Sequence, residues 1–336
     1  MSPRVGVVVN RHAGHGRART TGARVLDGLR STGADVVDLT ASGYDESLRA
    51  AREARSDLDA LVVVGGDGSV HLGVEAVGGT STPLVVVPAG SGNDFAACAG
   101  AARHRFDAPA LVAHLARATS LSASGETPGT VPGTGVRARR LDLLRATTDG
   151  TAHWVAGALS VGIDAAVNAR ANTYRWPRGR ARYLRAIAAE VLRSRPYGYR
   201  VTIERPGPAS RPGPESSPFR QDLVWEGPGT LAVVANIARI GGGIRVVPPA
   251  SLDDGLLDLV LAERLSRARL ALDVLPRLTR GRHLAHARVH HVQARGVVIE
   301  ASPHGAPPPG VFGDGEPLGR LPLHARVVPG ALHLLA

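Results

Sequence analysis

Lysine is absent from this chain, and cysteine and aromatic residues are scarce. All 40 basic residues are arginine, Cys98 is the only cysteine, and aromatic residues make up 4% of the 336 residues. A single cysteine excludes a disulfide within the chain and a cysteine-based zinc site. Without lysine, the chain cannot contain a Gly-x-x-x-x-Gly-Lys-Ser/Thr loop. The core must therefore be built from valine, leucine, alanine and isoleucine.

Long apolar runs are also missing. No segment reaches the roughly 18 consecutive apolar residues needed to span a bilayer, and residues 1–9 lack the apolar stretch of a signal peptide. Hydrophobic residues nevertheless make up 43% of the chain and charged residues 21%, as in globular proteins. The length predicts two domains, and the lone cysteine fits a reducing cytoplasm.

The net charge of +11 has two interpretations. One is an arginine-studded, solvated surface, and the other is attraction to a polyanion or an anionic membrane surface. We find no basic nucleic-acid recognition motif and therefore expect no nucleic-acid partner. Anionic lipid headgroups attract arginine, so a membrane surface remains open.

Residues 1–136 alternate short apolar runs with stretches of helical spacing. The runs at 4–9, 36–39, 61–64 and 84–87 are each followed by such a stretch. This alternation predicts an α/β domain, Rossmann-like and doubly wound, with a mostly parallel sheet and helices on both faces. The continuous apolar runs are typical of strands buried on both faces.

The second half has a different character. Residues 119–136 are rich in Ser, Gly, Thr and Pro and predict a linker, and residues 205–218 predict a disordered loop. Strand-like segments such as 154–161 dominate this half, with few helices. We predict a C-terminal β-sandwich-like domain over 137–320, after the first domain at 1–136. Residues 321–336 are expected to return to the first domain.

Three polar turns follow strands of the first domain, at residues 10–16, 65–69 and 88–95. Carboxyl ends of parallel strands share one edge of a sheet, where ligands bind. Glycines let the backbone approach a phosphate, and a following helix start favours negative charge. Ser69 and Ser91 could donate hydroxyl groups, whereas Asp67 is useful only if Mg²⁺ bridges it to phosphate. One such turn is commonly a plain strand-to-helix connection, but three together favour phosphate binding.

Two of these turns resemble a known family. Residues 65–69 (Gly-Gly-Asp-Gly-Ser) and 88–95 (Pro-Ala-Gly-Ser-Gly-Asn-Asp-Phe) are similar to the signature of the diacylglycerol kinase catalytic domain family, with serine for threonine in both. The first turn resembles the family's Asn-Pro-x-x-Gly loop, with Arg11 in place of proline. Residues 160–165, 182–184, 236–258 and 313–316 resemble later family segments, so the likeness covers nearly the whole chain.

The resemblance implies an ATP-dependent lipid kinase, a transferase that uses Mg²⁺ to phosphorylate the hydroxyl of diacylglycerol or a related lipid. It implies the following nucleotide-binding residues: Asn10, Gly14, Thr40, Gly65, Gly66, Asp67, Gly68, Ser69, Gly90, Ser91, Asn93 and Asp94. It also implies that Mg²⁺ bridges phosphate to Asp67 and Asp314. A second, structural Mg²⁺ is expected at Asp254, with main-chain carbonyls near Ser251 and Leu256.

The late Asp-Gly-Glu turn holds the expected catalytic pair. Asp314 and Glu316 flank a glycine, and for the residues alone a solvated β-turn is the usual outcome. The resemblance implies that Glu316 is the general base on the acceptor hydroxyl and that Asp314 assists it, with Asp67 acting through the metal. Phosphoryl transfer depends mainly on positioning, charge neutralisation and a carboxylate that orients the nucleophile.

The partners follow from the same resemblance. We expect a cytoplasmic protein without a transmembrane segment that docks at the inner face of the membrane to reach its lipid substrate. The oligomeric state stays open, a homodimer included. The alternatives are a soluble NAD kinase-like small-molecule kinase and a non-catalytic nucleotide-binding regulator. The Gly-Asn-Asp-Phe turn and the late Asp-Gly-Glu favour the lipid kinase, although the sequence does not identify the acceptor.

Overall fold

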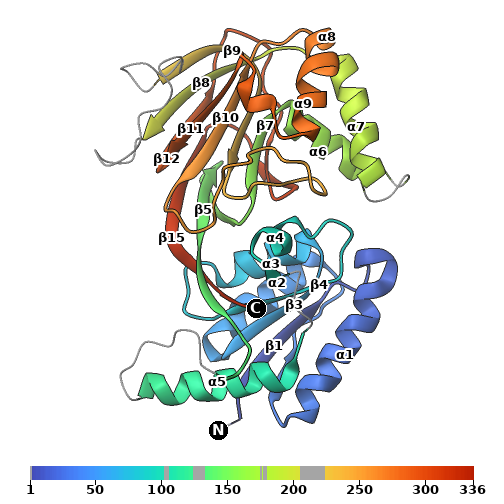
Figure 1. Ribbon diagram of the computed structural model, residues 1–336, viewed down its shortest axis with the longest axis vertical. Helices are drawn as coiled ribbons and strands as arrows, with labels where there is room; N and C mark the ends of the chain where they lie inside the picture. The colour runs from blue at the N-terminus through green and yellow to red at the C-terminus, as the bar shows by residue number, and fades with distance from the viewer. Residues whose placement is uncertain (1, 102–105, 124–132, 175, 177–179, 205–223) are drawn as a thin grey trace. The chain divides into compact units, whose positions relative to one another are not determined.

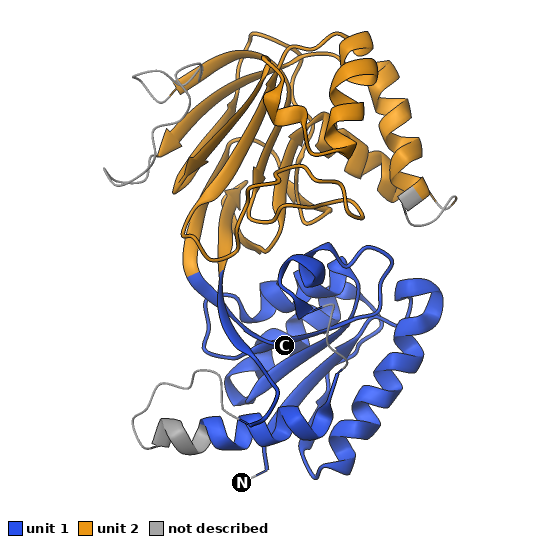
Figure 2. Ribbon diagram, in the orientation of Figure 1, with its two compact units in different colours: residues 1–141, 330–336 blue, residues 142–329 orange. Residues whose placement is uncertain are grey.

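The computed structural model describes the chain except residues 1, 102–105, 124–132, 175, 177–179 and 205–223 (Figure 1). The predicted loop at 205–218 therefore lies outside the described residues. The chain forms two compact units, residues 1–141 with 330–336 and residues 142–329 (Figure 2). It passes from one unit to the other within strands β5 (Ala138–Thr148) and β15 (Leu323–Leu335).

Unit 1 is built on a parallel sheet. Its strand order is β15-β4-β3-β1-β2, and every pair along that path is parallel. The strands are β1 (Arg4–Val9), β2 (Asp35–Asp38), β3 (Ala60–Gly65), β4 (Leu84–Pro88) and the end of β15. All six residues of β3 are buried. The strand is therefore covered on both faces, as its continuous apolar sequence predicts.

Helices cover the two faces of this sheet. They are α1 (Arg17–Ser31), α2 (Tyr44–Ala54), α3 (Asp67–Val77), α4 (Asp94–Cys98) and α5 (Ala108–Ala123), with short 3₁₀ turns at η1 (Ala13–Gly16) and η2 (Arg55–Asp57). Helices α1 and α5 pack Val25, Leu29, Leu111 and Leu115 into one core. On the opposite face, Gly73 of α3 lies against side chains of β3 and β4. The predicted α/β architecture with helices on both faces is confirmed.

One boundary in unit 1 was predicted wrongly. Residues 119–123 were expected to begin the linker, but α5 continues through them to Ala123. Serine and threonine cost a helix only a few tenths of a kcal/mol each relative to better helix formers, so their presence did not end it. Residues 124–132 of the predicted linker lie outside the described part of the chain.

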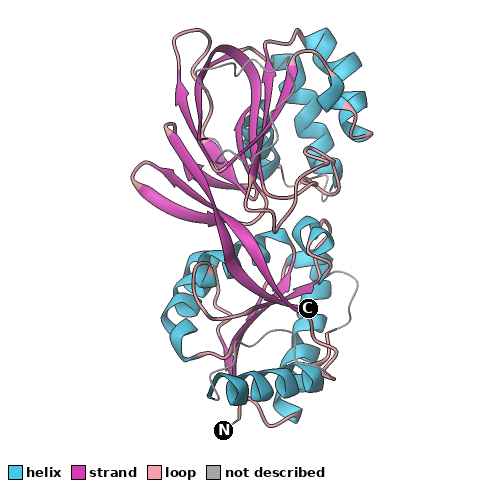
Figure 3. Ribbon diagram, turned by 60° about the vertical axis from the view of Figure 1, so that its left-hand side comes forward, coloured by secondary structure: helices cyan, strands magenta, loops and turns pink. Residues whose placement is uncertain are grey.

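Unit 2 is rich in antiparallel strands (Figure 3). One path runs β14-β13-β7-β9-β8-β12-β15, with β10 between β9 and β11 and with β6 on β5. The strands are β6 (Thr151–Val155), β7 (Ala158–Gly162), β8 (Tyr197–Glu204), β9 (Val224–Ala235), β10 (Leu257–Glu263), β11 (Val289–Ala294), β12 (Gly296–Ala301), β13 (Val311–Gly313) and β14 (Glu316–Gly319). Strand β8 alternates buried Tyr199, Val201 and Ile203 with more exposed residues, so one face lies in the core.

The helices of unit 2 gather on one side of its strands (Figure 1). They are α6 (Ile163–Thr173), α7 (Arg180–Arg193), α8 (Arg267–Arg269), the π-helical turn η4 (Leu270–Val274), α9 (Leu275–Thr279) and the 3₁₀ turn η5 (His283–Ala285). Val191, Leu270 and Val274 from these helices share a second core with Val233 and Val260 of β9 and β10. The predicted β-sandwich-like unit with a few helices is confirmed. Within the described residues, no helix has the length and apolarity to cross a membrane.

The predicted strand at 154–161 is in fact two strands. Strand β6 ends at Val155 and β7 begins at Ala158. The backbone N–H groups of Ala156, Gly157 and Ala158 donate hydrogen bonds to the carboxylate of Asp314 instead of continuing one ladder. An apolar run cannot reveal this break, because the acceptor lies more than 150 residues away in the sequence.

Packing at Gly73 gives a test of the fold of unit 1. A Cβ there would lie 2.7 Å from Leu84 Cδ1 and 3.0 Å from Val63 Cγ1. We expect Gly73→Ala to lower the free energy of unfolding by roughly 1–3 kcal/mol from overpacking, despite the better helix propensity of alanine. Urea unfolding followed by circular dichroism measures the change.

The control is Gly28→Ala in α1, where a Cβ would meet only Ala108 Cβ at 3.4 Å. That variant should be stabilised by about 0.4–1 kcal/mol. An unchanged midpoint for Gly73→Ala would show that α3 does not pack closely on β3 and β4.

Candidate functional site

The three predicted turns meet at one edge of unit 1. Strands β1, β3 and β4 are parallel, so their carboxyl ends lie side by side. Ala89 and Gly90 donate backbone hydrogen bonds to the Gly65 carbonyl at 2.7 and 3.1 Å. A Cβ on Gly14 would lie 1.9 Å from the Ala89 carbonyl oxygen, so the first turn touches the third. The backbones of all three turns are therefore in contact.

Gly66 and Gly90 bring the backbones of the second and third turns into close contact. A Cβ on Gly90 would lie 2.4 Å from Gly66 Cα, and one on Gly66 would lie 3.2 Å from Gly90 Cα. Gly65 has the same limitation, since its Cβ would lie 2.0 Å from Ser69 Oγ. Gly68 follows in the first turn of α3. Side chains are thus excluded at these three glycines, so the backbone of the two turns can approach a ligand closely.

The carboxylate of Asp67 connects the second turn to the third. Its Oδ2 accepts a hydrogen bond from the Asn93 amide at 2.8 Å, and its Oδ1 accepts one from the Phe95 amide at 3.3 Å. Burial raises the pKa of Asp67 to about 6, the neighbouring Asp94 carboxylate contributes to the rise, and these amide hydrogen bonds oppose it. Asp67 therefore carries its negative charge above about pH 6.

Asn93 closes the third turn on itself. Its backbone is left-handed with φ of 58°, a conformation that asparagine tolerates. Its Oδ1 accepts from the Gly90 amide at 3.0 Å, and its Nδ2 donates to the Gly90 carbonyl at 3.1 Å. Ser91 is exposed at the tip, and the side chain of Asp94 is buried at the start of α4. The turn is held by its own polar groups.

The first turn forms without the family proline. Asn10 Oδ1 accepts from the His12 amide at 3.1 Å, and the Asn10 carbonyl accepts from the Ala13 amide at 3.0 Å, while Arg11 is exposed. Thr40 Oγ1 accepts from the Val9 amide at 3.0 Å, directly before the turn. The hydroxyl of Thr40 therefore supports the end of β1.

Two further features of this edge bear on phosphate binding. Ser69 Oγ is buried and has no hydrogen-bond partner within the described residues. Arg17, which the sequence reading missed, donates from Nε to the Gly14 carbonyl at 3.1 Å and from its terminal nitrogen to the Gly90 carbonyl at 3.3 Å. Its position directly after a glycine-rich turn is the feature of the sequence that could have predicted this role. A buried hydroxyl and a guanidinium both suit an anion.

The carboxylates of this edge suit Mg²⁺ only in part. Across the described chain, no three His, Cys, Asp or Glu side chains gather closely enough to hold a metal ion. Asp67 and Asp94 are near enough for their charges to interact. Protein-bound Mg²⁺ usually takes one or two carboxylates, with phosphate oxygens and water completing six ligands. Asp67 thus fits a magnesium ion that arrives with a phosphate ligand.

In unit 2, Asp314 is anchored by backbone amides. Its Oδ1 accepts from Gly157 at 2.7 Å and from Ala158 at 3.1 Å, and its Oδ2 accepts from Ala156 at 2.9 Å. A Cβ on Gly157 would lie 2.7 Å from Oδ1, so this close approach needs glycine. With these bonds, the Asp314 carboxylate fixes the β13–β14 turn to the start of β7.

Glu316 is presented by that turn. It is the first residue of β14 and is exposed. The preceding carbonyl, that of Gly315, accepts from Asn172 Nδ2 of α6 at 3.1 Å. Asn172 is a second residue that sequence reasoning missed, because its partner is a backbone group. The arrangement holds the turn from two sides and leaves the Glu316 side chain at the surface.

The predicted structural metal ligands share one loop of unit 2. The Leu256 amide donates to Asp254 Oδ1 at 3.0 Å, and Ser251 lies at the loop start. Burial raises the pKa of Asp254, and the carboxylates of Asp258 and Asp142 raise it further. A cation would relieve this repulsion, but the metal site itself stays a prediction.

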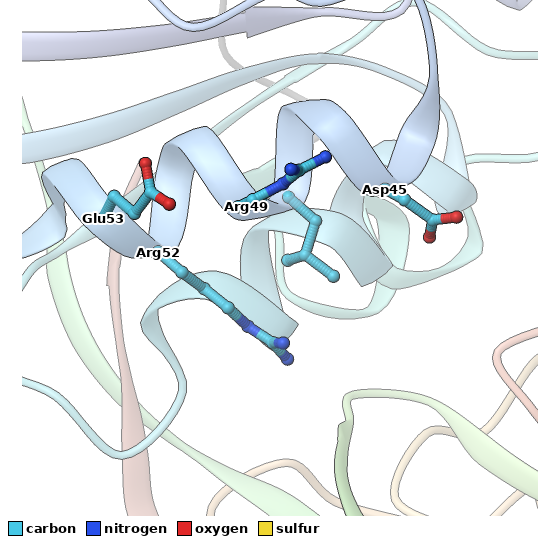
Figure 4. Close-up of a pocket in the computed structure, with 5 residues that line it drawn as sticks. Asp45, Arg49, Arg52 and Glu53 are labelled. Carbon is cyan, nitrogen blue, oxygen red and sulfur yellow. The ribbon is translucent and has the colours of Figure 1, made fainter.

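A shallow pocket elsewhere in unit 1 lacks these residues. It measures about 360 Å³ and is lined by Asp45, Leu48, Arg49, Arg52 and Glu53 of α2 (Figure 4). Arg52 donates to Glu75 Oε2 of α3 at 2.6 Å. The Arg52 guanidinium is therefore used in a contact that holds α2 against α3.

Comparison with known families agrees with the motifs. A model of the diacylglycerol kinase catalytic domain matches residues 4–124, and a model of the YegS C-terminal NAD kinase beta sandwich-like domain matches residues 157–336. The two matches cover the glycine turns of unit 1 and the Asp-Gly-Glu turn of unit 2.

Relatives extend over the full length. A protein of Mycobacterium tuberculosis named "Diacylglycerol kinase" is 31% identical over 99% of this chain and 94% of its own. A "Probable lipid kinase YegS-like" of Stenotrophomonas maltophilia is 27% identical over 62% of this chain and 57% of its own. The crystal structure of a diacylglycerol kinase from Bacillus anthracis, 19% identical, shares the fold with a TM-score of 0.66 over 99% of this chain and 96% of that one. The resemblance inferred from the motifs is confirmed: this chain belongs to the diacylglycerol kinase catalytic domain family and, like YegS-type lipid kinases, carries the YegS C-terminal domain.

Proposed function

We propose that the protein transfers the γ-phosphate of ATP to a lipid hydroxyl, with Mg²⁺ as the metal. The observation that carries the proposal is the contact between the Gly66 and Gly90 backbones, fixed by the hydrogen bonds of Asp67 to the third turn. Such glycine-lined backbone at strand ends is suited to a polyphosphate. Membership of a kinase family supports ATP as its source.

Diacylglycerol is the acceptor that we propose first. The Mycobacterium tuberculosis relative that aligns over nearly the whole chain is named for it. Other lipid alcohols present the same chemical group, and the glycine turns would not distinguish them because they meet the nucleotide. The acceptor must therefore be identified by its phosphorylated product.

In unit 1, the proposed roles concern the nucleotide. Backbone N–H groups of residues 66–68, 91 and 92 bind phosphate oxygens, and the Ser69 hydroxyl adds a donor. Asp67 would hold Mg²⁺ in addition to its two amide hydrogen bonds, since an ionised carboxylate offers about four lone-pair sites. The metal, when bound, neutralises charge on the transferred phosphate. Asn10, Gly14 and Thr40 shape the first turn beside these groups.

In unit 2, the proposed roles concern the acceptor. Glu316, which is exposed, takes the proton of the lipid hydroxyl as that oxygen attacks the γ-phosphorus and ADP leaves. Asp314 positions the turn through its three amide hydrogen bonds. No contact in the described residues tests a direct part for Asp314 in metal binding, and that role stays a prediction. The proposed metal at Asp254 has a structural role only.

One assay tests the function as a whole. The protein is incubated with Mg²⁺ and ATP labelled at the γ-phosphate, with diacylglycerol, other lipid alcohols or NAD as separate acceptors. We expect label in a chloroform-soluble phospholipid. Label in NADP would instead support the soluble-kinase alternative, and ATP binding without product would support the regulator.

Glu316 provides the sharpest test of the mechanism. We expect Glu316→Gln to lower kcat by about 10²–10⁴-fold, the usual contribution of a general base, with little change in the KM for ATP. Stability should stay within about 0.5 kcal/mol, because the side chain is exposed.

The matched control is Glu300→Gln, another exposed glutamate of unit 2, which should retain wild-type kcat. Initial rates at saturating ATP, alongside thermal unfolding of both variants, make the comparison. Equal kcat in Glu316→Gln and wild type would remove Glu316 from the chemistry.

The raised pKa of Asp67 predicts a pH dependence of stability. Because burial raises that pKa from 3.8 to about 6, the folded chain binds the proton more tightly than the unfolded chain. The free energy of unfolding, taken relative to Asp67→Asn, should therefore fall as pH rises from about 4 to 6, by roughly 1–3 kcal/mol at most. The stabilisation is present below pH 4 and absent above pH 6. Urea unfolding of both proteins between pH 4 and 7 measures it, and a constant difference would contradict the burial of this carboxyl.

A further inference from the structure

Exposed large apolar side chains concentrate on the helices of unit 2. Among the described residues, five large hydrophobic side chains are exposed, and four of them belong to the α6–α9 region: Trp176, Leu184, Leu192 and Leu272. Leu192 is 70% exposed and Leu272 is 80% exposed. Isolated surface leucines are common, but such a concentration on one group of helices marks an interaction surface.

The exposed residues of α7 form a stripe. Leu184, Ala188 and Leu192 are four residues apart and exposed, so they lie along one face of the helix. Ile187 and Val191, three and seven residues after Leu184, lie on the adjacent side of the helix and pack against the core shared with η4 and α9. The stripe is therefore the edge of the apolar face that this core leaves exposed.

Most of the net charge lies in the same region. Residues 181–196 and 263–288 contain eleven arginines and three acidic residues, a net charge of +8 out of the +11 of the whole chain. The three acidic residues each have a basic partner: Glu190 contacts Arg170, Glu263 contacts His290, and Asp273 contacts Arg277. The net charge of +8 already includes these three acids.

Four of these arginines line one open pocket. The pocket, of about 630 Å³, lies where the end of α7 meets the start of α8, and its lining includes Arg264, Arg267, Arg269 and Arg288. Arg267 Nε donates to the Ser194 carbonyl at 3.2 Å, which fixes the two helix ends together. Glu263 lies 3.9 Å from Arg288. Clustered guanidinium groups of this kind suit phosphate oxygens.

Helix α7 connects this pocket to the turn that presents Glu316. Its first turn carries Tyr183, whose hydroxyl lies 3.9 Å from the position of a Cβ on Gly315, and its last residue, Arg193, precedes Ser194 of the pocket. Fourteen residues of helix span about 21 Å. The apolar stripe runs along this length.

We propose that the exposed face of α7 with η4, and the arginine pocket beside it, form a docking surface for an anionic phospholipid bilayer. Leu184, Leu192 and Leu272 enter the interfacial layer, and the pocket arginines bind lipid phosphates. An apolar stripe bordered by arginine matches a bilayer, which offers hydrocarbon below anionic headgroups. A helix lying in that plane leads from the headgroup site to the Asp-Gly-Glu turn. Delivery of a lipid acceptor to Glu316 rests on the proposed function. Binding of the bilayer does not, since it needs no catalysis.

Vesicle binding without ATP tests the surface. The full chain is sedimented with vesicles of phosphatidylcholine alone or mixed equally with phosphatidylglycerol, at about 0.15 M salt. We expect binding to the mixed vesicles only. The triple variant Arg264→Gln, Arg267→Gln, Arg269→Gln should bind about a hundredfold more weakly, at about fivefold per arginine. The double variant Leu192→Ser, Leu272→Ser should lose up to about tenfold in binding.

The control removes the same charge elsewhere. Arg19→Gln, Arg24→Gln and Arg30→Gln change exposed arginines of α1 in unit 1 and should bind within about twofold of wild type. Equal losses in the two triple variants, or wild-type binding in both unit 2 variants, would overturn the proposal. So would retention on duplex DNA at the same salt with no vesicle binding. Matching thermal unfolding curves confirm that the variants are folded.

Activity separates this proposal from the proposed function. The unit 2 variants should phosphorylate a dispersed short-chain diacylglycerol at the wild-type rate but diacylglycerol in anionic vesicles more slowly. If the wild type phosphorylates no lipid, the proposed function fails while the vesicle result still decides the docking surface.

Discussion

Hydrogen bonds from backbone amides to two aspartates are the interaction on which both candidate regions depend. Asp67 accepts from Asn93 and Phe95 in unit 1, and Asp314 accepts from the amides of residues 156–158 in unit 2. In each case the carboxylate joins a turn to a segment distant in the sequence. Charge-assisted hydrogen bonds are roughly twice as strong as neutral ones, so few of them fix a loop. The same bonds give each turn one defined conformation.

Three glycines make these close contacts possible. Gly66, Gly90 and Gly157 stand where a Cβ would strike backbone or a carboxylate oxygen. Removing the side chain allows two turns to touch and leaves amide N–H groups as the available donors. Neutral donors of fixed direction suit phosphate oxygens without adding charge, and this is the basis for assigning the nucleotide to unit 1.

The sequence predicted the parts of this protein that depend on local pattern. The apolar runs of β1, β3 and β4 and the glycine turns after them were visible because period and composition act over a few residues. The family resemblance followed from the same turns and from the late Asp-Gly-Glu. The break at Gly157 and the support of Gly315 by Asn172 were not predictable, because each depends on a backbone partner brought close only by folding. Arg17 was missed although it directly follows a glycine-rich turn, because its second partner, the Gly90 carbonyl, is distant in the sequence. The end of α5 was misplaced because serine and threonine are common to linkers and helices.

Arginine has two different uses in this chain. Arg17 and Arg52 hydrogen-bond within unit 1 and support its loops and helices. The arginines near α7 and α8 gather beside exposed leucines. Net charge alone could not separate these uses. Their distribution does, and it is the basis for proposing a docking surface on unit 2.

Hydrogen–deuterium exchange with and without Mg²⁺ and a non-hydrolysable ATP analogue would show whether the glycine turns of unit 1 bind the nucleotide. We expect slower exchange for amides of residues 65–69 and 89–95, with little change at the α2 pocket. In Gly90→Ala, whose Cβ would lie 2.4 Å from Gly66 Cα, this protection should be lost. Protection confined to other segments, or no protection at saturating nucleotide, would contradict nucleotide binding by the glycine turns.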